Sequence, residues 1–353
     1  MIVRVEPLTE LASGVDALYL SGRASLPLDL LQRLEAARRE AEVLEGSPPF
    51  QFGSLATTIA PHAWGKHRYC LDHPFLRLGL TDKSGIPALR IQPRAEFIHG
   101  AGVRAVTDSI MDLLESECGV VKLHVSRIDL FADVQGWPLT GNDRESFLCR
   151  ASNLGTFEEQ GSLTGLQFGK RKTGTVNARI YDKTEEIKTS GALYWNDIWG
   201  ERFNPDLQVH RIEFEVWRGA LREFNLNEPY EVLDATGALW AYCTSWLSHR
   251  VPTNDATKSR WPVSPYWEDI CRATIAENSH GIERTFKGKQ DGEMGLMLPA
   301  LIGYLARFGA LSDSYSEEEM LENLKVFLTR YAKHTHTPMN YRIRQKRREL
   351  GLL

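Results

Sequence analysis

The chain has 353 residues, of which 42% are hydrophobic and 25% charged, which is typical of a globular protein with one large or two ordinary domains. Its net charge of −4 argues against a protein that coats nucleic acid non-specifically, so any DNA contact must come from a local basic patch. The five cysteines are widely spaced and lack a C-x-x-C motif, which favours reduced thiols. With no secretory signal and no membrane span expected, the sequence indicates a cytoplasmic protein without membrane association.

The N-terminal third mixes strands and helices. An amphipathic helix is predicted from Pro27, because leucines and alanines recur at helical spacing as far as Leu44. Gly79, Gly85 and Pro87 are interpreted as breakers between two short strands. The elements predicted in this third, besides the first helix, are a strand at 15–20, a loop at 46–52, strands at 67–71 and 88–92, and a helix at 103–117.

The middle third is rich in strands, and the remainder is rich in helices. Strands are predicted at 121–134, 163–169, 176–182 and 209–217, and a basic turn joins the second and third of these into a hairpin. Helices are predicted at 230–249, 265–276, 296–308 and 316–332. We therefore expect an α+β fold with helices packed on one face of an antiparallel sheet, followed by a C-terminal helical region. The expected domains are a catalytic part at 1–225 and a helical part at 226–353.

Three of the predicted strands carry ionisable side chains at alternate positions. Alternate residues of a strand point to the same face. If these strands are neighbours, one face of the sheet gathers charge while the other is apolar. Such crowding is costly unless the charges are solvated, paired or bound to metal. The same pattern also arises as plain decoration of a solvated sheet, and spacing alone favours that reading. The residues of the charged face are Arg127, Asp129, Asp133, Arg179, Tyr181, Lys183, Arg211, Glu213 and Glu215.

This set of residues suits cleavage and rejoining of a phosphodiester. A tyrosine hydroxyl is a weak nucleophile that needs activation, which Arg179 and Lys183 beside Tyr181 would assist. Carboxylates hold Mg²⁺ or Mn²⁺, and such an ion polarises a phosphoryl oxygen. A covalent phosphotyrosine would keep the bond energy, so that a 3′-hydroxyl rejoins the strand without ATP.

Three segments resemble the replication-initiation-factor family, which comprises rolling-circle replication initiators of plasmids and phages and related relaxases of mobile elements. They read SRIDLFADV at 126–134, TGLQFGKRKTGTVNARIYDKTEE at 164–186 and HRIEFEV at 210–216. The tyrosine segment is the most specific of them. Arg260, Trp261, Pro262 and Trp267 resemble a further element of the family, and the whole resemblance spans about residues 60 to 270. The basic turn at 169–173 differs in sequence from the turn usual in the family but keeps its positive charge.

The resemblance implies that Tyr181 is the nucleophile, with Arg179 and Lys183 beside it. It further implies a metal site for Mg²⁺ or Mn²⁺ built from acids among Asp129, Asp133, Glu213 and Glu215. The implied contacts to DNA come from Lys170, Arg171, Lys172, Arg127 and Arg211.

Replication initiation at an origin hairpin, with single-stranded DNA at the nick, is the function that the resemblance implies. It also implies a host helicase and a homodimer as further partners. Three alternatives stay open: a conjugative relaxase of an integrative element, a non-catalytic DNA-binding regulator with the same fold, and a structural or interaction protein whose sheet is merely decorated with charge.

Overall fold

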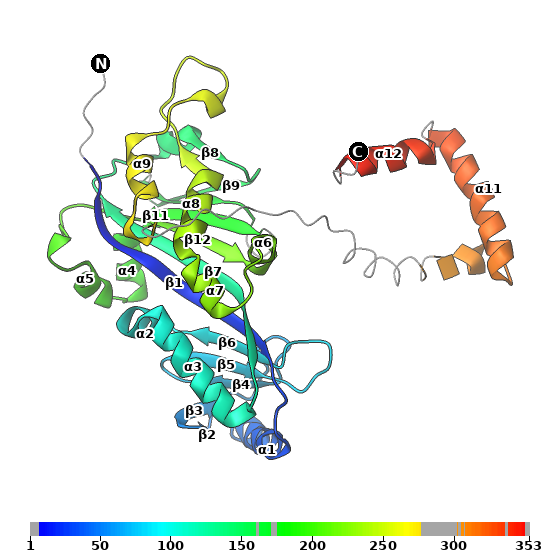
Figure 1. Ribbon diagram of the computed structural model, residues 1–353, viewed down its shortest axis with the longest axis horizontal. Coiled ribbons are helices and arrows are strands. Elements are labelled where there is room, and N and C mark those ends of the chain that lie inside the picture. The colour runs from blue at the N-terminus through cyan, green and yellow to red at the C-terminus, as the bar shows by residue number, and fades with distance from the viewer. Residues whose placement is uncertain are drawn as a thin grey trace. The chain divides into compact units, whose positions relative to one another are not determined.

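The computed structural model describes residues 7–159, 162–170, 175–276, 302, 305–306, 308–335 and 338–349. The chain forms two compact units, Met1–Arg284 and Thr285–Leu353 (Figure 1). The boundary expected near residue 225 marks the change from strands to helices. The compact units separate further along the chain, because the helices that follow residue 225 pack on the sheet.

Within the described residues, eleven strands form a single sheet in the order β2-β3-β4-β5-β6-β1-β7-β12-β11-β10-β9, and all neighbours are antiparallel. The two long central strands are β1 (Thr9–Arg23) and β7 (Lys122–Gln135). The other nine are β2 (Pro49–Phe52), β3 (Leu55–Ile59), β4 (Tyr69–Asp72), β5 (Leu76–Leu80), β6 (Leu89–Pro93), β9 (Leu154–Glu159), β10 (Ser162–Phe168), β11 (Val176–Asp182) and β12 (Val209–Trp217). A small second sheet pairs β8 (Phe147–Cys149) with β13 (Leu247–His249).

The main hydrophobic core lies between one face of the large sheet and a layer of helices. Alternate residues of β7, such as Ile128 and Leu130, enter this core together with Ile212 and Phe214 of β12. Helices α3, α7 and α8 lie across this face in Figure 1. The helices that contribute buried side chains to this core are α1 (Leu28–Leu44), α2 (Ala95–Ala101), α3 (Val103–Cys118), α6 (Arg218–Glu223), α7 (Pro229–Asp234), α8 (Thr236–Trp246) and α9 (Pro265–Cys271).

A second, smaller apolar cluster covers part of the opposite face. It joins Phe131 of β7 to side chains of α4 (Lys183–Ser190) and α5 (Tyr194–Trp199). Trp195 and Trp199 of α5 are both almost completely buried there. Aromatic rings therefore cover one end of the sheet face opposite the main core, and they exclude water from the side chains beside them.

The fold class expected from the sequence is confirmed: a mixed α+β protein with a large antiparallel sheet, helices and a C-terminal helical region. The C-terminal unit contains α11 (Glu317–Thr335) and α12 (Met339–Glu349), and acids occupy the first turn of α11, where they suit the positive end of a helix. The helix expected at 296–308 falls largely outside the described residues. No helix in the described part of the chain is long and apolar enough to span a bilayer.

The loop expected at 46–52 instead contains strand β2, which pairs with β3, and two further expectations about local structure were wrong. Gly79 is not a breaker but lies inside strand β5, where a Cβ atom would come within 3.0 Å of His67, so the residue is small because a loop packs on it. The helix expected at 230–249 is interrupted at Ala235 and gives way to strand β13. Hydrophobic spacing did not reveal either feature, since both depend on contacts with distant parts of the chain.

Candidate active site

The register of the sheet brings the three charged strands side by side. Strand β12 lies between β7 and β11, and its Glu215 is opposite Asp129. Glu213 is opposite Arg179, and Arg211 is opposite Tyr181. Directly opposed residues of antiparallel strands share a face, so the charged face that the alternation suggested is present.

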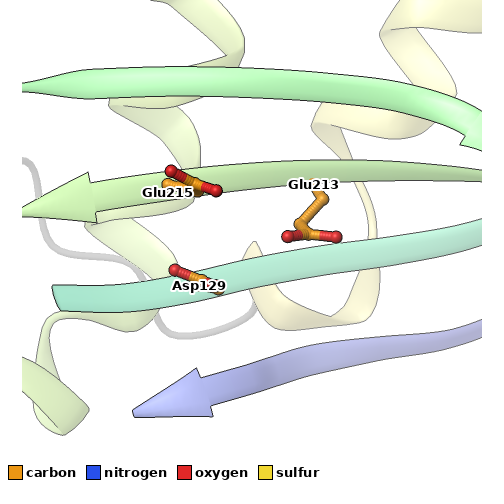
Figure 2. A group of neighbouring side chains, drawn as sticks. All are labelled: Asp129, Glu213 and Glu215. Carbon is orange, nitrogen blue, oxygen red and sulfur yellow. The ribbon is translucent and has the colours of Figure 1, made fainter. Parts of the chain in front are cut away.

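Three carboxylates form the centre of this face. Asp129, Glu213 and Glu215 each offer an oxygen atom, and these atoms lie within 4.8 Å of one another (Figure 2). The three residues are 2%, 1% and 1% exposed, respectively. A compact set of hard oxygen donors fits a divalent ion such as Mg²⁺ or Mn²⁺.

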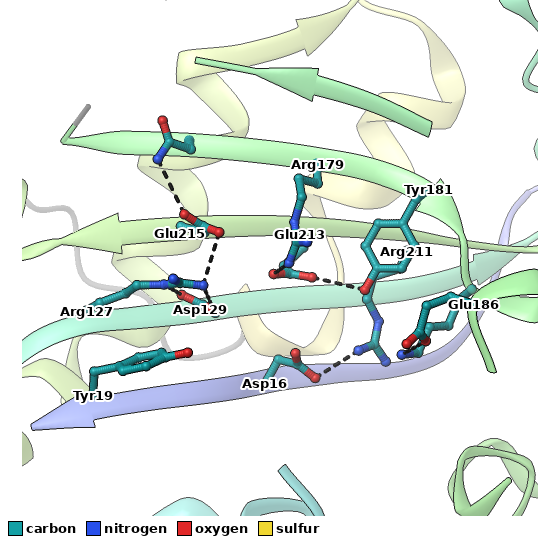
Figure 3. A network of polar contacts seen from close by, with 12 residues as sticks. Asp16, Tyr19, Arg127, Asp129, Arg179, Tyr181, Glu186, Arg211, Glu213 and Glu215 are labelled. Carbon is teal, nitrogen blue, oxygen red and sulfur yellow. Dashed lines mark hydrogen bonds and ion pairs between the residues drawn. The ribbon is translucent and has the colours of Figure 1, made fainter. Parts of the chain in front are cut away.

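Two arginines share these carboxylates (Figure 3). Arg127 donates to both oxygens of Asp129 and also pairs with Glu215 at 3.0 Å. Arg179 donates to Glu213. Burial raises the pKa of Asp129 to about 8, and the negative charges of Glu213 and Glu215 act in the same direction.

Tyr181 lies next to the carboxylate cluster. Its hydroxyl donates a hydrogen bond of 3.0 Å to Oε2 of Glu213. Burial, followed by the negative charge of Glu213, raises the pKa of this phenol well above its ordinary value, so the group is neutral at rest. Asp182 caps helix α4 immediately afterwards by accepting bonds from two backbone N–H groups, which fixes where the strand ends.

A pocket of about 560 Å³ opens above Tyr181. Its lining includes Gln167, Arg179, Tyr181, Lys183 and Glu213. The residue paired with Tyr181 on strand β10 is Gly165, and a Cβ atom there would come within 3.3 Å of the Cβ of Tyr181. The missing side chain therefore leaves room for the tyrosine beside the pocket.

Lys183 follows the tyrosine on the first turn of α4. It is buried and forms an ion pair with Glu186, another residue that lines the pocket. Its Nζ lies 6.0 Å from the centre of the Tyr181 ring and 5.1 Å from that of Trp195. The cation is thus held beside the phenol by a carboxylate and two aromatic faces.

Arg211 and Asp133 form a separate ion pair. Nε and Nη2 of Arg211 donate to the two oxygens of Asp133 at 2.6 and 2.7 Å, while Nη1 donates to Asp16 at 2.8 Å. Trp199 also donates to Asp133. Asp133 is therefore engaged by these partners and is not one of the three acids that converge on a shared centre.

The basic turn is only partly described. Lys170 borders a shallow depression together with Asn153 and Thr175. Arg171 and Lys172, which the sequence also suggested as contacts for DNA, lie outside the described residues.

Several residues of this face did not emerge from the sequence. Asp16 occupies a bulge of β1, because the pairing passes from Val15 opposite Leu130 to Ala17 opposite Asp129. A bulge breaks the alternation on which a sequence argument depends and re-aims the side chain. His99 of α2 and Trp195 of α5 reach the face from helices, so no strand pattern signals them.

No family model matches the chain, and no curated protein matches its sequence. Among solved structures, it is similar to a rolling circle replication initiator protein from Geobacillus stearothermophilus, with a TM-score of 0.43 and 13% sequence identity. The match covers 79% of this chain and 99% of the other. The side chains of the site, rather than this likeness, carry the functional inference.

Proposed function

We propose that the chain nicks and rejoins one strand of DNA through a covalent 5′-phosphotyrosine at Tyr181, and so initiates rolling-circle replication of a plasmid, phage or mobile element. The observation that carries the proposal is the 3.0 Å hydrogen bond from the Tyr181 hydroxyl to Glu213, at the edge of a three-carboxylate cluster and beside an open pocket. The DNA substrate and the biological setting come from the resemblance of the three sequence segments.

Glu213 is placed to act as the general base. A hydrogen bond of 3.0 Å is within the range for direct proton transfer. As the tyrosine oxygen bonds to phosphorus, its proton passes to Glu213, and the bond from phosphorus to the 3′ oxygen breaks. That oxygen takes up a proton from solvent and leaves as a 3′-hydroxyl. Rejoining is the reverse reaction, in which a 3′-hydroxyl attacks the phosphotyrosine.

The carboxylates Asp129, Glu213 and Glu215 would hold a Mg²⁺ or Mn²⁺ ion, which when bound would polarise a non-bridging phosphoryl oxygen. In this proposal Asp133 orients Arg211 instead of binding metal, because it accepts two hydrogen bonds from Arg211 and lies outside the set of acids whose oxygens converge.

Cations around the pocket would neutralise the scissile phosphate. Arg179 and Lys183 both line the pocket beside Tyr181. Burial lowers the pKa of Arg179, but Glu213 and Tyr181 outweigh it and the pKa lies above its usual range, so the guanidinium is always charged. Guanidinium groups bind phosphate oxygens through paired hydrogen bonds, which suits Arg179 to that role.

One observation favours a second candidate, a DNA-binding regulator without catalysis. Each carboxylate of the cluster is paired with an arginine, Arg127 or Arg179. Such a closed ionic network would also arise in a protein that keeps the fold alone. The two candidates differ in whether a covalent bond to DNA forms.

The test incubates the protein with Mn²⁺ and with supercoiled or single-stranded DNA from the region around its own gene, and then resolves the products on a denaturing gel. We expect nicked DNA and a covalent adduct from the wild type. Tyr194→Phe is a matched control, since Tyr194 lines the same pocket, and it should still form the adduct. Tyr181→Phe should form none. A shift of DNA without any adduct from the wild type would instead identify a binding protein.

A further inference from the structure

A second large pocket lies at the other end of the central strands from the Arg211 pair. It has a volume of about 840 Å³ and is formed by the end of β1, the start of β7, the loop between β5 and β6, and helix α6. Five cationic side chains line it: Arg23, Lys83, Lys122, Arg218 and Arg222. The acidic residues in its lining are Asp82 and Glu228, so the pocket is cationic in a chain whose net charge is −4.

These cations are not neutralised by the protein. Within the described part of the chain, none of the five forms an ion pair, and Arg218 donates a hydrogen bond of 3.1 Å to the backbone oxygen of Val125. Arg218 and Arg222 are four residues apart on α6, so they project from the same side of that helix. Like charges are held together here with no ion pair to any of them among the described residues, which favours the binding of an anion.

The pKa of His124, which lines the pocket, responds to the same positive charges. Burial lowers the pKa of His124 to about 4, and the positive charges of Arg218, Arg222 and Arg23 lower it in addition. Burial and Arg222 also lower the pKa of Arg218. The protein itself therefore makes the potential in this pocket strongly positive.

The pocket is aligned with the candidate active site along strand β7. Lys122 and His124 alternate with the core residues Leu123 and Val125, and a bulge at Ser126 reverses the alternation, so they emerge on the face that also carries Asp129. At about 3.3 Å per residue, Lys122 lies roughly 20 Å along the strand from Asp129. That span matches about six base-pair steps of duplex DNA, which rises 3.4 Å along its axis for each nucleotide of a strand.

We infer that this cationic pocket is a second binding site for the DNA backbone, which holds the phosphates about six nucleotides away from the phosphodiester attacked by Tyr181. The inference rests on the proposed function for its choice of DNA as the ligand. Lys122 and Arg222 are two of the exposed cations of the pocket, and they would contact phosphate, while Arg218 is partly buried and donates to the backbone oxygen of Val125.

Fluorescence anisotropy with a labelled DNA hairpin, single-stranded at the nick and duplex beside it, tests the inference in a Tyr181→Phe background, in which no cleavage intervenes. Lys122→Glu and Arg222→Glu should each weaken binding about tenfold. Each should also reduce the slope of log affinity against log salt by about one, as expected when a phosphate contact is lost. Arg144→Glu is the matched control, because Arg144 is exposed and lies outside the pocket, and it should leave both quantities unchanged. Oligonucleotides that extend fewer than about six nucleotides from the nick should bind all four proteins alike.

The outcomes separate this inference from the proposed function. If Lys122→Glu and Arg222→Glu bind long DNA as tightly as Arg144→Glu does, the pocket is not a DNA site, whether or not the wild type forms an adduct. Loss of binding in these variants, in a protein that never forms an adduct, would support the pocket and refute the nicking activity. Failure of the wild type to bind DNA at all would overturn the inference. As a second measurement, the NMR-detected pKa of His124 should rise when DNA binds.

Discussion

Two ionic networks lie side by side on one sheet face and use the same residue types, but their carboxylates are arranged differently. In the first, Arg211 is held between Asp133 and Asp16 and also packs against the rings of Phe131 and Trp195. Burial would raise the pKa of Asp16, but Arg211 and the hydrogen bond with His99 outweigh it and lower the pKa below its ordinary value. Asp16 is therefore stable as an anion.

In the second network, among the described residues, three carboxylates share Arg127 and Arg179, and the pKa of Asp129 is raised to about 8. The comparison teaches that the convergence of several carboxylates on one point, more than the presence of charge, distinguishes a network suited to bind a cation from one that holds the fold. The three converging carboxylates lie beside Tyr181, and the Arg211 network lies next to them.

The largest effect is expected for the tyrosine. Tyr181→Phe should reduce DNA nicking at least about a thousandfold, because no other hydroxyl replaces the one bonded to Glu213. The variant should lose only about 1 kcal/mol of unfolding free energy, the usual contribution of one hydrogen bond. Nicking kinetics and urea denaturation measure the two effects. A variant that nicks DNA at the wild-type rate would show that the chemistry lies elsewhere.

The Arg211 network predicts a large loss of stability instead. Arg211→Met should lower the free energy of unfolding by about 3–5 kcal/mol, because it leaves Asp133 buried without its counter-charge. Urea denaturation measures this loss. Lys188→Met, which removes an exposed ion pair with Glu185, is the control and should leave the free energy of unfolding nearly unchanged. If the two variants were equally stable, the Arg211 pair would not hold the fold.

The three converging carboxylates of the second network predict a distinctive dependence of stability on pH. Because the pKa of Asp129 is raised in the folded chain, its ionisation opposes folding, so its contribution to stability is complete below about pH 4 and declines as the pH rises to about 8. Asp16, whose pKa is lowered, contributes in the opposite sense, and its contribution is lost as the pH falls below about 4. Asp129→Asn should therefore remove at least about 1 kcal/mol of the decline between pH 4 and 8, as followed by thermal unfolding at a series of pH values.

The same carboxyl should make metal binding depend on pH. A proton must leave Asp129 before the oxygen binds a cation, so Mn²⁺ should raise the melting temperature more at pH 9 than at pH 6. In Asp129→Asn the metal-induced shift should be small at both values. An equal shift in the wild type and this variant would exclude Asp129 from the metal site.

The smallest predicted effect concerns the space beside the tyrosine. Gly165→Ala should displace Tyr181, because the new Cβ would lie 3.3 Å from its Cβ, and it should slow nicking severalfold at a cost of about 1 kcal/mol in stability. Gly155→Ala on the neighbouring strand is the control, since its Cβ would make ordinary contacts of 3.8 Å. Equal nicking rates would show that the tyrosine tolerates the methyl group.

Sequence reasoning worked best where alternation along a strand is regular. The strand at 209–217 was predicted with its observed bounds, and the shared face of Asp129 and Glu213 followed from residue parity. The sequence could not choose among the acids, because Asp133 and Asp129 have the same parity. The register, which no single strand encodes, pairs Asp133 with Arg211.

The parts that were missed depend on irregular or distant contacts. Asp16 reaches the site through a bulge, and His99 reaches it from a helix that the sequence did not indicate. Strand β5 was missed because Gly79 looked like a breaker, although a loop packed on it explains the residue. The domain limits and the roles of Lys170, Arg171 and Lys172 stay predictions.

The most direct measurement is to digest the covalent protein–DNA adduct with protease and to locate the nucleotide-bearing residue by mass spectrometry. The account predicts a single modified peptide that contains Tyr181, joined through a phosphate to the 5′ end of the cleaved strand. An adduct on any other residue, including Tyr19 or Tyr194 on the same side of the sheet, would contradict it.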